Sequence, residues 1–119
     1  MSLSIVIPCK NEEKIIVKTT KDILNNFTYD DNFEILIIDD FSNDQTYKIV
    51  ENSFLNNNKI KIFKNKNFGG LGEAIKTGIE SSSMEFVCFF MSDASDSVED
   101  LNKYVFEISK NSLDAVFGS

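Results

Sequence analysis

The chain of 119 residues contains no histidine and no arginine, because all 12 of its basic residues are lysines. Without an imidazole or a guanidinium group, any handling of protons or phosphates falls to carboxylates, lysines, backbone amides or a metal ion. The formal net charge of -7 argues against nucleic acid as a partner, because surfaces that follow a phosphate backbone are basic.

Cysteines are few and long apolar runs are absent. The two cysteines, Cys9 and Cys88, lie within or beside expected strands, where a free thiol packs as a small apolar group. A disulfide is therefore not expected, and a reducing cytoplasm is the default compartment. The apolar stretch at residues 3–8 is too short for a signal peptide, and no run reaches the length of a membrane span. The length allows one domain at most.

Apolar segments of strand length alternate with amphipathic segments of helix length along the whole chain. We expect strands at residues 3–7, 35–38, 59–64, 86–91 and 114–118, and inward helical stripes within 16–27, 47–54, 71–79 and 101–108. Pro8 should stop the first strand, and the alternating third strand should lie near a sheet edge. The pattern predicts an α/β fold with a doubly wound, mainly parallel, Rossmann-like sheet and helices on both faces.

The second strand ends in an acidic pair. Its uninterrupted aliphatic run, Ile35 to Ile38, is typical of a strand buried on both faces, and Asp39 and Asp40 follow directly. In open α/β sheets ligands bind outside the carboxyl ends of the strands, so the pair is a candidate ligand site. The alternative is a helix-capping loop, but a cap at Asn43 or Asp44 would leave the pair unexplained.

Two further polar clusters follow strands that should end at the same rim. Asn11 and Glu12 follow the first strand, and Asp93 and Asp96 follow the fourth. Glu12 could instead only complement the dipole of the next helix. Carboxylates gathered on one rim repel one another unless a cation joins them, and hard oxygen ligands favour Mg²⁺ or Mn²⁺. Such an ion would bridge to a diphosphate, so a nucleotide-diphosphate donor fits this rim.

The same residues resemble family 2 glycosyltransferases of the GT-A fold. The segments that carry the resemblance are Ser4-Ile-Val-Ile-Pro8 with Asn11-Glu12-Glu13, Ile38-Asp39-Asp40-Phe41-Ser42 with Asp44 and Thr46, then Asn67, Gly69, Gly72, Ala74 and Gly78, and Asp93. The terminal Ala115-Val-Phe-Gly-Ser119 resembles a segment of the polyprenyl-phosphate sugar transferases, the dolichol-phosphate mannosyltransferase-like members. The resemblance covers the whole chain. Its separate pieces are weak, as with the glycines, which also simply permit tight turns.

The resemblance implies roles by position. Asp39 and Asp40 would read the base and the ribose, and Asp93 would be the metal-side acid of the Asp-X-Asp motif. The other residues of the implied nucleotide pocket are Pro8, Asn11, Glu12, Ser42, Gly69 and Gly72. Two positions depart from the family pattern. Ser95 stands where the second acid is usual, with Asp96 one residue further, so Asp96 is a candidate second metal ligand and the completing residue is open. Gly70-Leu71 stands where the family often has Lys or Arg.

The resemblance implies a glycosyltransferase that moves a sugar from a UDP- or GDP-linked donor, with inversion, to a polyprenyl phosphate or a glycan. Such enzymes need an acceptor half, and its catalytic residue is not in this chain. We therefore expect residues 1–119 to form a single nucleotide-sugar-binding domain that is truncated before the acceptor half. The full-length protein would act in the cytoplasm or at the cytoplasmic face of the membrane, and the uncovered sheet edge favours a homodimer.

Three rival functions are open at this point. The first is a non-catalytic module that binds a nucleotide sugar without turning it over. The second is a receiver domain of bacterial signalling, which would need acids where Pro8-Cys9-Lys10 and Lys64-Asn65-Lys66 stand. The third is a sugar nucleotidyltransferase, which is disfavoured because the loop after the first strand lacks a glycine-rich phosphate cradle.

Overall fold

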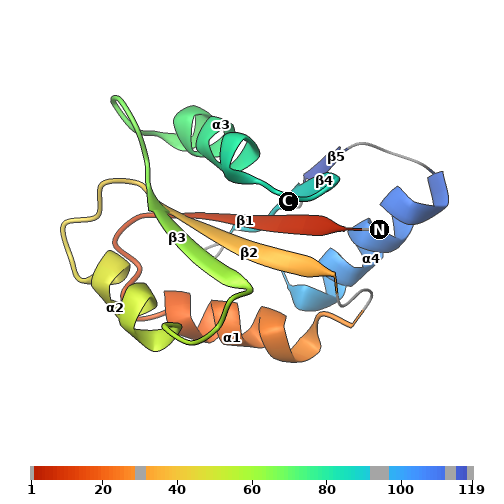
Figure 1. Ribbon diagram of the computed structural model, residues 1–119, viewed down its shortest axis with the longest axis horizontal. Helices are drawn as coiled ribbons and strands as arrows, with labels where there is room; N and C mark the ends of the chain where they lie inside the picture. The colour runs from red at the N-terminus through yellow and green to blue at the C-terminus, as the bar shows by residue number, and fades with distance from the viewer. Residues whose placement is uncertain (1, 29–31, 92–96, 112–114, 118–119) are drawn as a thin grey trace.

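Figure 1 shows a computed structural model that describes residues 2–28, 32–91, 97–111 and 115–117. The elements in chain order are β1 (Leu3–Cys9), α1 (Ile16–Asn26), β2 (Phe33–Asp39), α2 (Thr46–Ser53), β3 (Ile60–Lys64), α3 (Leu71–Ser81), β4 (Phe86–Phe89), α4 (Val98–Asn111) and β5 (Ala115–Phe117). The strands form one five-stranded sheet in the order β3-β2-β1-β4-β5. All of its strand pairs are parallel. The predicted α/β fold is therefore confirmed.

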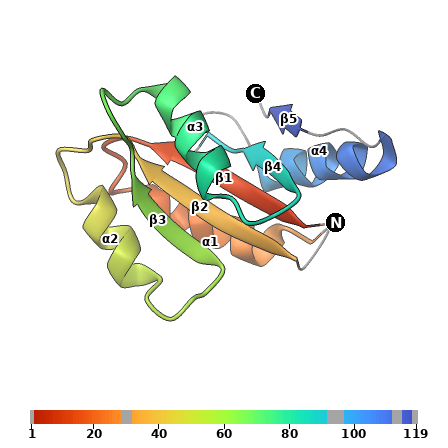
Figure 2. The ribbon, with the colours of Figure 1, turned by 45° about the horizontal axis from the view of Figure 1, so that its top comes forward.

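Helices cover both faces of the sheet, as a doubly wound fold requires. Every residue of β1 and β2 is buried, which explains their nearly continuous apolar sequence. Successive strand residues face opposite ways, so Ile5 and Ile35 pack in one core with α1, α2 and α4, whereas Val6 and Leu36 pack with Ala74 of α3. Figures 1 and 2 show α3 on one side of the sheet and α1 and α2 on the other.

The prediction that Pro8 stops the first strand is wrong. β1 continues through Pro8 and ends at Cys9. The backbone of Val6 faces β4, because the Val6 carbonyl accepts a hydrogen bond from the Phe90 N–H (2.9 Å). The backbone of Cys9 faces β2, because the Cys9 carbonyl accepts one from the Asp40 N–H (2.8 Å). Pro8 stands two residues after Val6 and so faces β4. The register of β1 with β4 ends at Val6, so the missing N–H of proline interrupts no ladder bond.

The buried stripe of α3 is rotated from the predicted one. Leu71 and Ile79, expected to face inward, are 53% and 54% exposed, whereas Thr77 is 1% exposed. The cause is close packing at Gly78, where a Cβ atom would lie 2.6 Å from the Val6 side chain. The helix approaches β1 through Gly78, so Thr77 beside the glycine and Ala74 one turn before it face inward, and Ile79 is left exposed.

Two smaller predictions are confirmed. The alternating strand β3 lies at one edge of the sheet. Ser97 caps α4, since its hydroxyl oxygen accepts a hydrogen bond from the Asp100 N–H at 3.1 Å. None of the helices in the described ranges combines the length and the apolarity that a membrane span requires.

The strand order places a topological switch point between β1 and β4. From β1 the chain adds β2 and β3 on one side of the sheet, and β4 and β5 on the other. In such sheets the connections diverge at the switch point and leave a crevice outside the carboxyl ends of the strands. The carboxyl ends of β1, β2 and β4 are therefore where the fold favours a ligand.

Candidate functional site

The loops that follow β1 and β2 are tied together by hydrogen bonds. The Asn11 N–H donates to the Ser42 hydroxyl oxygen (2.8 Å), and the Asn43 N–H donates to the Asn11 side-chain oxygen (2.7 Å). The Glu12 N–H donates to the Thr46 hydroxyl oxygen (2.9 Å). The first two polar clusters therefore lie on one rim of the sheet, as predicted.

Asp44 has the helix-start role that the sequence allows. Its carboxylate accepts a hydrogen bond from the Thr46 N–H (2.9 Å) just ahead of α2, and another from the Glu13 N–H (3.3 Å). Partial burial raises the pKa of Asp44, but the hydrogen bonds from Thr46 and Glu13 outweigh it and leave the pKa below its usual value. Asp44 thus orders the rim at the start of the helix, and Asp39 and Asp40 need another explanation.

Asp39 ends β2 with a buried carboxylate that is 5% exposed. The Ser42 hydroxyl donates a hydrogen bond to this carboxylate. Asp39 lies opposite Cys9 in the ladder between β1 and β2. Burial, with Asp39 as the next contribution, raises the pKa of the Cys9 thiol far above its usual value. Cys9 is therefore a neutral packing residue and not a nucleophile.

Asp40 organises the turn that precedes α3. Its Oδ1 atom accepts hydrogen bonds from the Gly70 N–H (2.8 Å) and from the side-chain amide of Asn65 (3.0 Å). A Cβ atom at Gly69, where φ is +77°, would lie 2.5 Å from the same oxygen. Gly69 therefore lets the turn close over the Asp40 carboxylate, which no larger residue would allow without movement.

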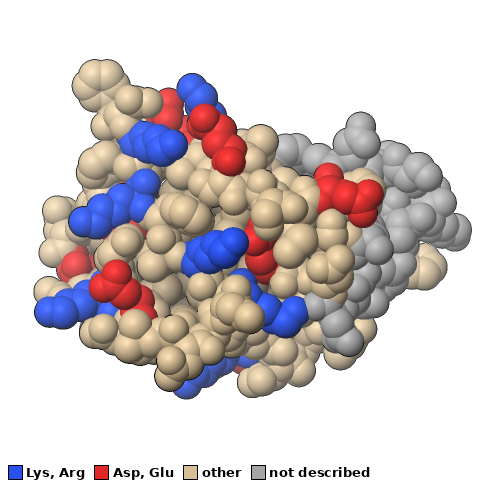
Figure 3. All heavy atoms as spheres, viewed as in Figure 1, with Lys and Arg blue, Asp and Glu red and all other residues tan. Residues whose placement is uncertain are grey.

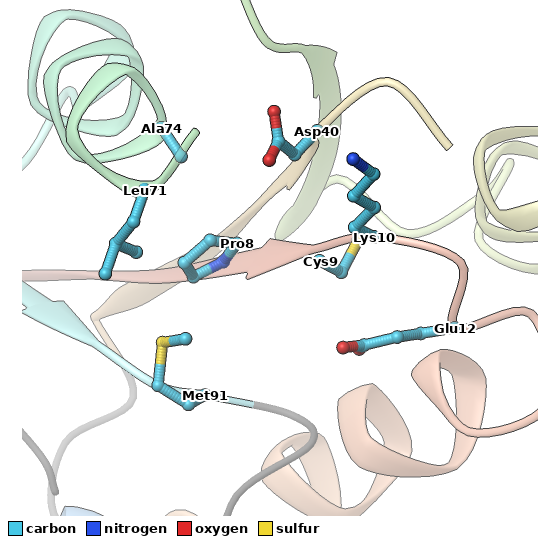
Figure 4. Close-up of a pocket in the computed structure, with 8 residues that line it drawn as sticks. All are labelled: Pro8, Cys9, Lys10, Glu12, Asp40, Leu71, Ala74 and Met91. Atoms are coloured by element: carbon cyan, nitrogen blue, oxygen red, sulfur yellow. The ribbon is translucent and has the colours of Figure 1, made fainter. Parts of the chain in front are cut away.

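A pocket of about 170 Å³ lies at the switch point. The residues that line it are Pro8, Cys9, Lys10, Glu12, Asp40, Leu71, Ala74 and Met91. Figure 4 shows Pro8 and Cys9 on β1 between Asp40 and Met91, with Leu71 and Ala74 entering from α3. The pocket thus combines an apolar floor with two carboxylates and one lysine, the mixture typical of small-molecule sites.

Two further hollows border this pocket or its rim. One, of about 570 Å³, shares Lys10 and Glu12 with the pocket and is also lined by Asn11. The other, of about 310 Å³, is lined by Asp39 and Ser42. Asp39 and Asp40 therefore face different spaces, because consecutive residues at a strand end point to opposite faces of the sheet.

The structure brings some of the predicted site residues together and separates others. Pro8, Glu12 and Asp40 line the pocket, Asn11 lines the adjoining hollow, Asp39 and Ser42 line the hollow on the other face, and Gly69 backs Asp40. Gly72 lies in the exposed first turn of α3, with open space where a Cβ atom would stand. Asp93 and Asp96 lie outside the described residues.

Sequence reasoning missed several residues of the pocket. Lys10, Leu71, Ala74 and Met91 line it, and Asn65 holds Asp40. Lys10 has a signal in its position directly after β1. Asn65 has the same signal, because it follows β3 directly. Leu71, Ala74 and Met91 have none, since their place depends on how α3 and β4 pack.

Within the described ranges, no three side chains of Asp, Glu, Cys or His lie close enough together to hold a metal ion. Glu12 and Asp40 present hard oxygen ligands at the pocket, but this pair alone does not make a metal site. Asp93 and Asp96, which the sequence predicts as ligands of Mg²⁺ or Mn²⁺, lie outside those ranges. On the face shown in Figure 3, lysines are interspersed with acidic side chains.

The sequence matches known proteins over most of its length. The family described as "Glycosyl transferase family 2" matches residues 4–119. The dolichyl-phosphate beta-glucosyltransferase of Dictyostelium discoideum is 32% identical over 129 residues, which cover 98% of this chain and 39% of that protein. The poly(ribitol-phosphate) beta-N-acetylglucosaminyltransferase TarS of Staphylococcus aureus is 32% identical over 94 residues, or 78% of this chain and 16% of TarS.

Solved structures show the same fold. TarS residues 1–349 in complex with UDP-GlcNAc align with a TM-score of 0.73 and 29% identity, over 92% of this chain and 32% of that one. A mannosyltransferase from Pyrobaculum calidifontis in complex with GDP-Man and Mn²⁺ aligns with a TM-score of 0.76 over 90% of this chain and 32% of that one. Its identity of 19% supports the fold alone.

These matches decide between the rival families. The chain spans between 16% and 39% of the length of the two relatives described. Its doubly wound sheet, its acidic rim and the family match over residues 4–119 agree with one another. The receiver domain and the nucleotidyltransferase are thereby set aside. The chain belongs to glycosyl transferase family 2, with the GT-A fold.

Proposed function

We propose that this chain is the donor-binding part of a glycosyltransferase and that the switch-point pocket holds a nucleoside-diphosphate sugar. The observation that carries the proposal is the pairing of Asp40 and Glu12 in one pocket at the carboxyl ends of β1 and β2. The TarS complex with UDP-GlcNAc supports it, because that chain shares both the fold and 29% of the aligned sequence.

Each polar group of the pocket has a role suited to such a donor. Asp40 is an acceptor for ribose hydroxyls or base N–H groups, and Glu12 is a second acceptor across the pocket. Lys10 supplies a positive charge for the diphosphate. The pocket is small for a whole nucleotide sugar, so the donor would extend into the adjoining hollow that shares Lys10 and Glu12.

A divalent ion would complete the site. We propose that Asp93 and Asp96 supply its carboxylate ligands, since they follow the strand on the far side of the switch point. When bound, Mg²⁺ or Mn²⁺ would neutralise the diphosphate as a leaving group. The complex of the Pyrobaculum calidifontis enzyme with GDP-Man and Mn²⁺ shows such an ion in a protein of this fold.

The acceptor would be a polyprenyl phosphate or a glycan. The dolichyl-phosphate relative supports the first. The name of TarS gives a poly(ribitol-phosphate), which supports a polymer rather than a lipid as the alternative acceptor. We propose inverting transfer in the cytoplasm or at the cytoplasmic face of a membrane, with a dimer through the sheet edge. Residues 1–119 span at most 39% of the two relatives described, so we propose that the acceptor-side groups come from outside residues 1–119.

The first prediction is that the 119-residue chain binds a nucleotide sugar but does not transfer its sugar. The reason is that the pocket described above holds donor-side groups only. A transfer assay with radiolabelled UDP- and GDP-sugars and polyprenyl phosphate checks this. Robust product formation by the chain alone would contradict it, and it would show that the acceptor-side chemistry is already present.

The second prediction concerns the metal. Asp93→Asn should abolish the metal-dependent part of the affinity for UDP or GDP and leave the metal-free part unchanged, because an amide is a weaker ligand for a hard cation. Titration calorimetry with Mn²⁺ and with chelator measures both parts. Asp100→Asn, a matched change in the first turn of α4, should keep the metal dependence. An unchanged metal dependence in Asp93→Asn would place the ion elsewhere.

A further inference from the structure

We propose that Asn65 is a positioning residue of the pocket, which holds the Asp40 carboxylate so that its Oδ2 atom faces the bound nucleotide. The proposal rests on the proposed function of the pocket. Asn65 follows β3 directly and does not line the pocket itself. It would act only through Asp40.

Asn65 is buried, with 5% of its surface exposed, and its side chain is fully hydrogen-bonded. Its Nδ2 group donates to Asp40 Oδ1 (3.0 Å) and to the Gly70 carbonyl (3.0 Å). Its Oδ1 atom accepts from the Lys66 N–H (2.9 Å) and from the Thr77 hydroxyl (3.3 Å). An amide offers two donor hydrogens and two acceptor lone pairs, and all four are used here.

The partners of Asn65 also fix which way its amide points. The Lys66 N–H can only donate and the Gly70 carbonyl can only accept, so the side-chain oxygen must face Lys66 and the nitrogen must face Gly70. In that orientation the nitrogen reaches Asp40 as well. Asn65 therefore joins the end of β3, the acid after β2 and the start of α3.

The consequence for Asp40 is a carboxylate with two unequal oxygens. Among the described contacts, both hydrogen bonds of the Asp40 side chain go to Oδ1, one from the Gly70 N–H (2.8 Å) and one from Asn65. Oδ2 is then the oxygen presented to a ligand donor such as a ribose hydroxyl. Two donors on one oxygen hold the carboxylate against rotation, which preorganises the site for binding.

Aspartate at position 65 is the sharpest test, because it has the size of asparagine but no donor when ionised. The introduced carboxylate would face Asp40 Oδ1 and the Gly70 carbonyl, both of them acceptors. Two ionised carboxylates this close repel each other. The pair therefore binds one proton at a higher pH than an isolated carboxyl group does. The protonated pair regains a donor. Acid should therefore restore what the substitution removes.

The experiment measures the affinity of the unsubstituted chain and Asn65→Asp for UDP-GlcNAc and GDP-mannose with Mn²⁺, at about pH 8 and about pH 5.5. Nucleotide sugars carry no phosphate monoester, whose second proton would titrate between these values. At about pH 8, Asn65→Asp should bind about tenfold more weakly than the unsubstituted chain. At about pH 5.5 the two should agree within about threefold.

Matched variants separate this effect from others. Asn57→Asp makes the same change beyond the other end of β3, where its oxygen accepts from the Lys59 N–H and a carboxylate can do so too. It should bind like the unsubstituted chain at both pH values. Asn65→Ser, which is too short to reach Asp40, should bind weakly at both pH values without rescue by acid. Thermal unfolding at both pH values checks that each variant is folded.

Other titratable groups near Asp40 are common to all the variants. Lys10 and Glu12 face it across the pocket, Asp39 precedes it, Lys64 and Lys66 flank Asn65, and Glu73 lies in the first turn of α3. Their protonation changes affect the unsubstituted chain and Asn57→Asp equally. The recovery of affinity in acid is therefore measured as the change in affinity of Asn65→Asp between the two pH values, relative to the same change in these two proteins.

A ligand-free measurement keeps this proposal distinct from the proposed function. Hydrogen exchange of the Gly70 amide, which donates to Asp40, should be faster in folded Asn65→Ser than in the unsubstituted chain. Faster exchange would support the positioning role even if none of these proteins bound a nucleotide sugar. The lack of binding would refute the proposed function alone. Unchanged exchange, or an affinity loss in Asn65→Asp that acid does not restore, would overturn the role of Asn65.

Discussion

Replacing Glu34 by alanine should lower the free energy of unfolding by about 3–5 kcal/mol, the usual cost of removing one member of a buried, hydrogen-bonded charge network. Glu34 lies in β2 and is 3% exposed. Its carboxylate accepts hydrogen bonds from the Ser4 hydroxyl (2.6 Å), from the Ser83 N–H (2.9 Å) and hydroxyl (3.0 Å), and from the Lys61 ammonium group (3.3 Å). Its loss would leave the Ser83 N–H and hydroxyl without this acceptor, and the Ser4 hydroxyl with only its bond to the Ser82 hydroxyl (2.6 Å).

The position of Glu34 explains why so much depends on it. It lies near the amino end of β2, at the opposite end of the strand from Asp39, and joins three parts of the chain. Ser4 belongs to β1, Lys61 to β3, and Ser83 to the connection between α3 and β4. The carboxylate therefore fastens the end of α3 to the sheet, and its removal should loosen that connection first.

The effect of Glu34 should depend on pH in a stated direction. Burial raises the pKa of Glu34, but hydrogen bonds from Ser4, Ser83 and Lys61 outweigh it and leave the pKa below its usual value. A group with a lowered folded pKa stabilises the protein fully above its unfolded pKa of about 4.3. That contribution is lost as the pH falls through the folded pKa.

Urea unfolding of the unsubstituted chain and Glu34→Ala measures both effects. The difference in free energy of unfolding between the two proteins should have its full value at about pH 7 and should shrink as the pH falls below about 4. Glu51→Ala, a change at an exposed glutamate of α2, is the control and should cost less than about 1 kcal/mol. A Glu34→Ala variant as stable as this control would show that the network contributes little.

Asp40→Asn should weaken the binding of UDP- or GDP-sugar by about 1–3 kcal/mol, with or without metal. Asparagine has the shape of aspartate, and its oxygen can still accept from the Gly70 N–H and from Asn65. Its nitrogen would then stand where the aspartate presents Oδ2. The pocket would then present an N–H group to the hydroxyl or N–H groups of the ligand, and no hydrogen bond would form there. The turn before α3 would stay intact.

Two comparisons make the Asp40 result specific. Asp22→Asn makes the same change on the exposed face of α1, away from the pocket, and should leave the affinity unchanged. The stability of Asp40→Asn should stay within about 0.5 kcal/mol of the unsubstituted chain, because Oδ1 keeps its bonds. If Asp40→Asn binds UDP- and GDP-sugars as tightly as Asp22→Asn does, Asp40 is not part of the nucleotide site.

The topology could be predicted because it depends on local patterns. The aliphatic run from Ile35 to Ile38 marked a strand buried on both faces, and the alternation around Ile60 and Ile62 marked an edge strand. Glu34 was missed because its partners lie far away in the sequence. A carboxylate beside a buried run gives no local sign that Ser83 will satisfy it.

The site could be predicted only as a rim. The sequence placed Asp39 and Asp40 at a strand end, but which face each would take depends on where the ladder stops, and β2 ends at Asp39. In the same way, the close approach of Gly78 to Val6 set the rotation of α3. These outcomes follow from packing between elements, which sequence periodicity does not encode.

The most direct test of the central claim is an amide NMR titration of the labelled chain with UDP-GlcNAc and with GDP-mannose, in the presence of Mg²⁺. If the switch-point pocket holds the donor, the shifted amides should cluster at Lys10, Asp40, Gly70 and Ala74. Those around Leu55, beyond the end of α2, should not move. No shifts with either donor at millimolar concentration, or shifts confined to the region around Leu55, would contradict the proposed donor site.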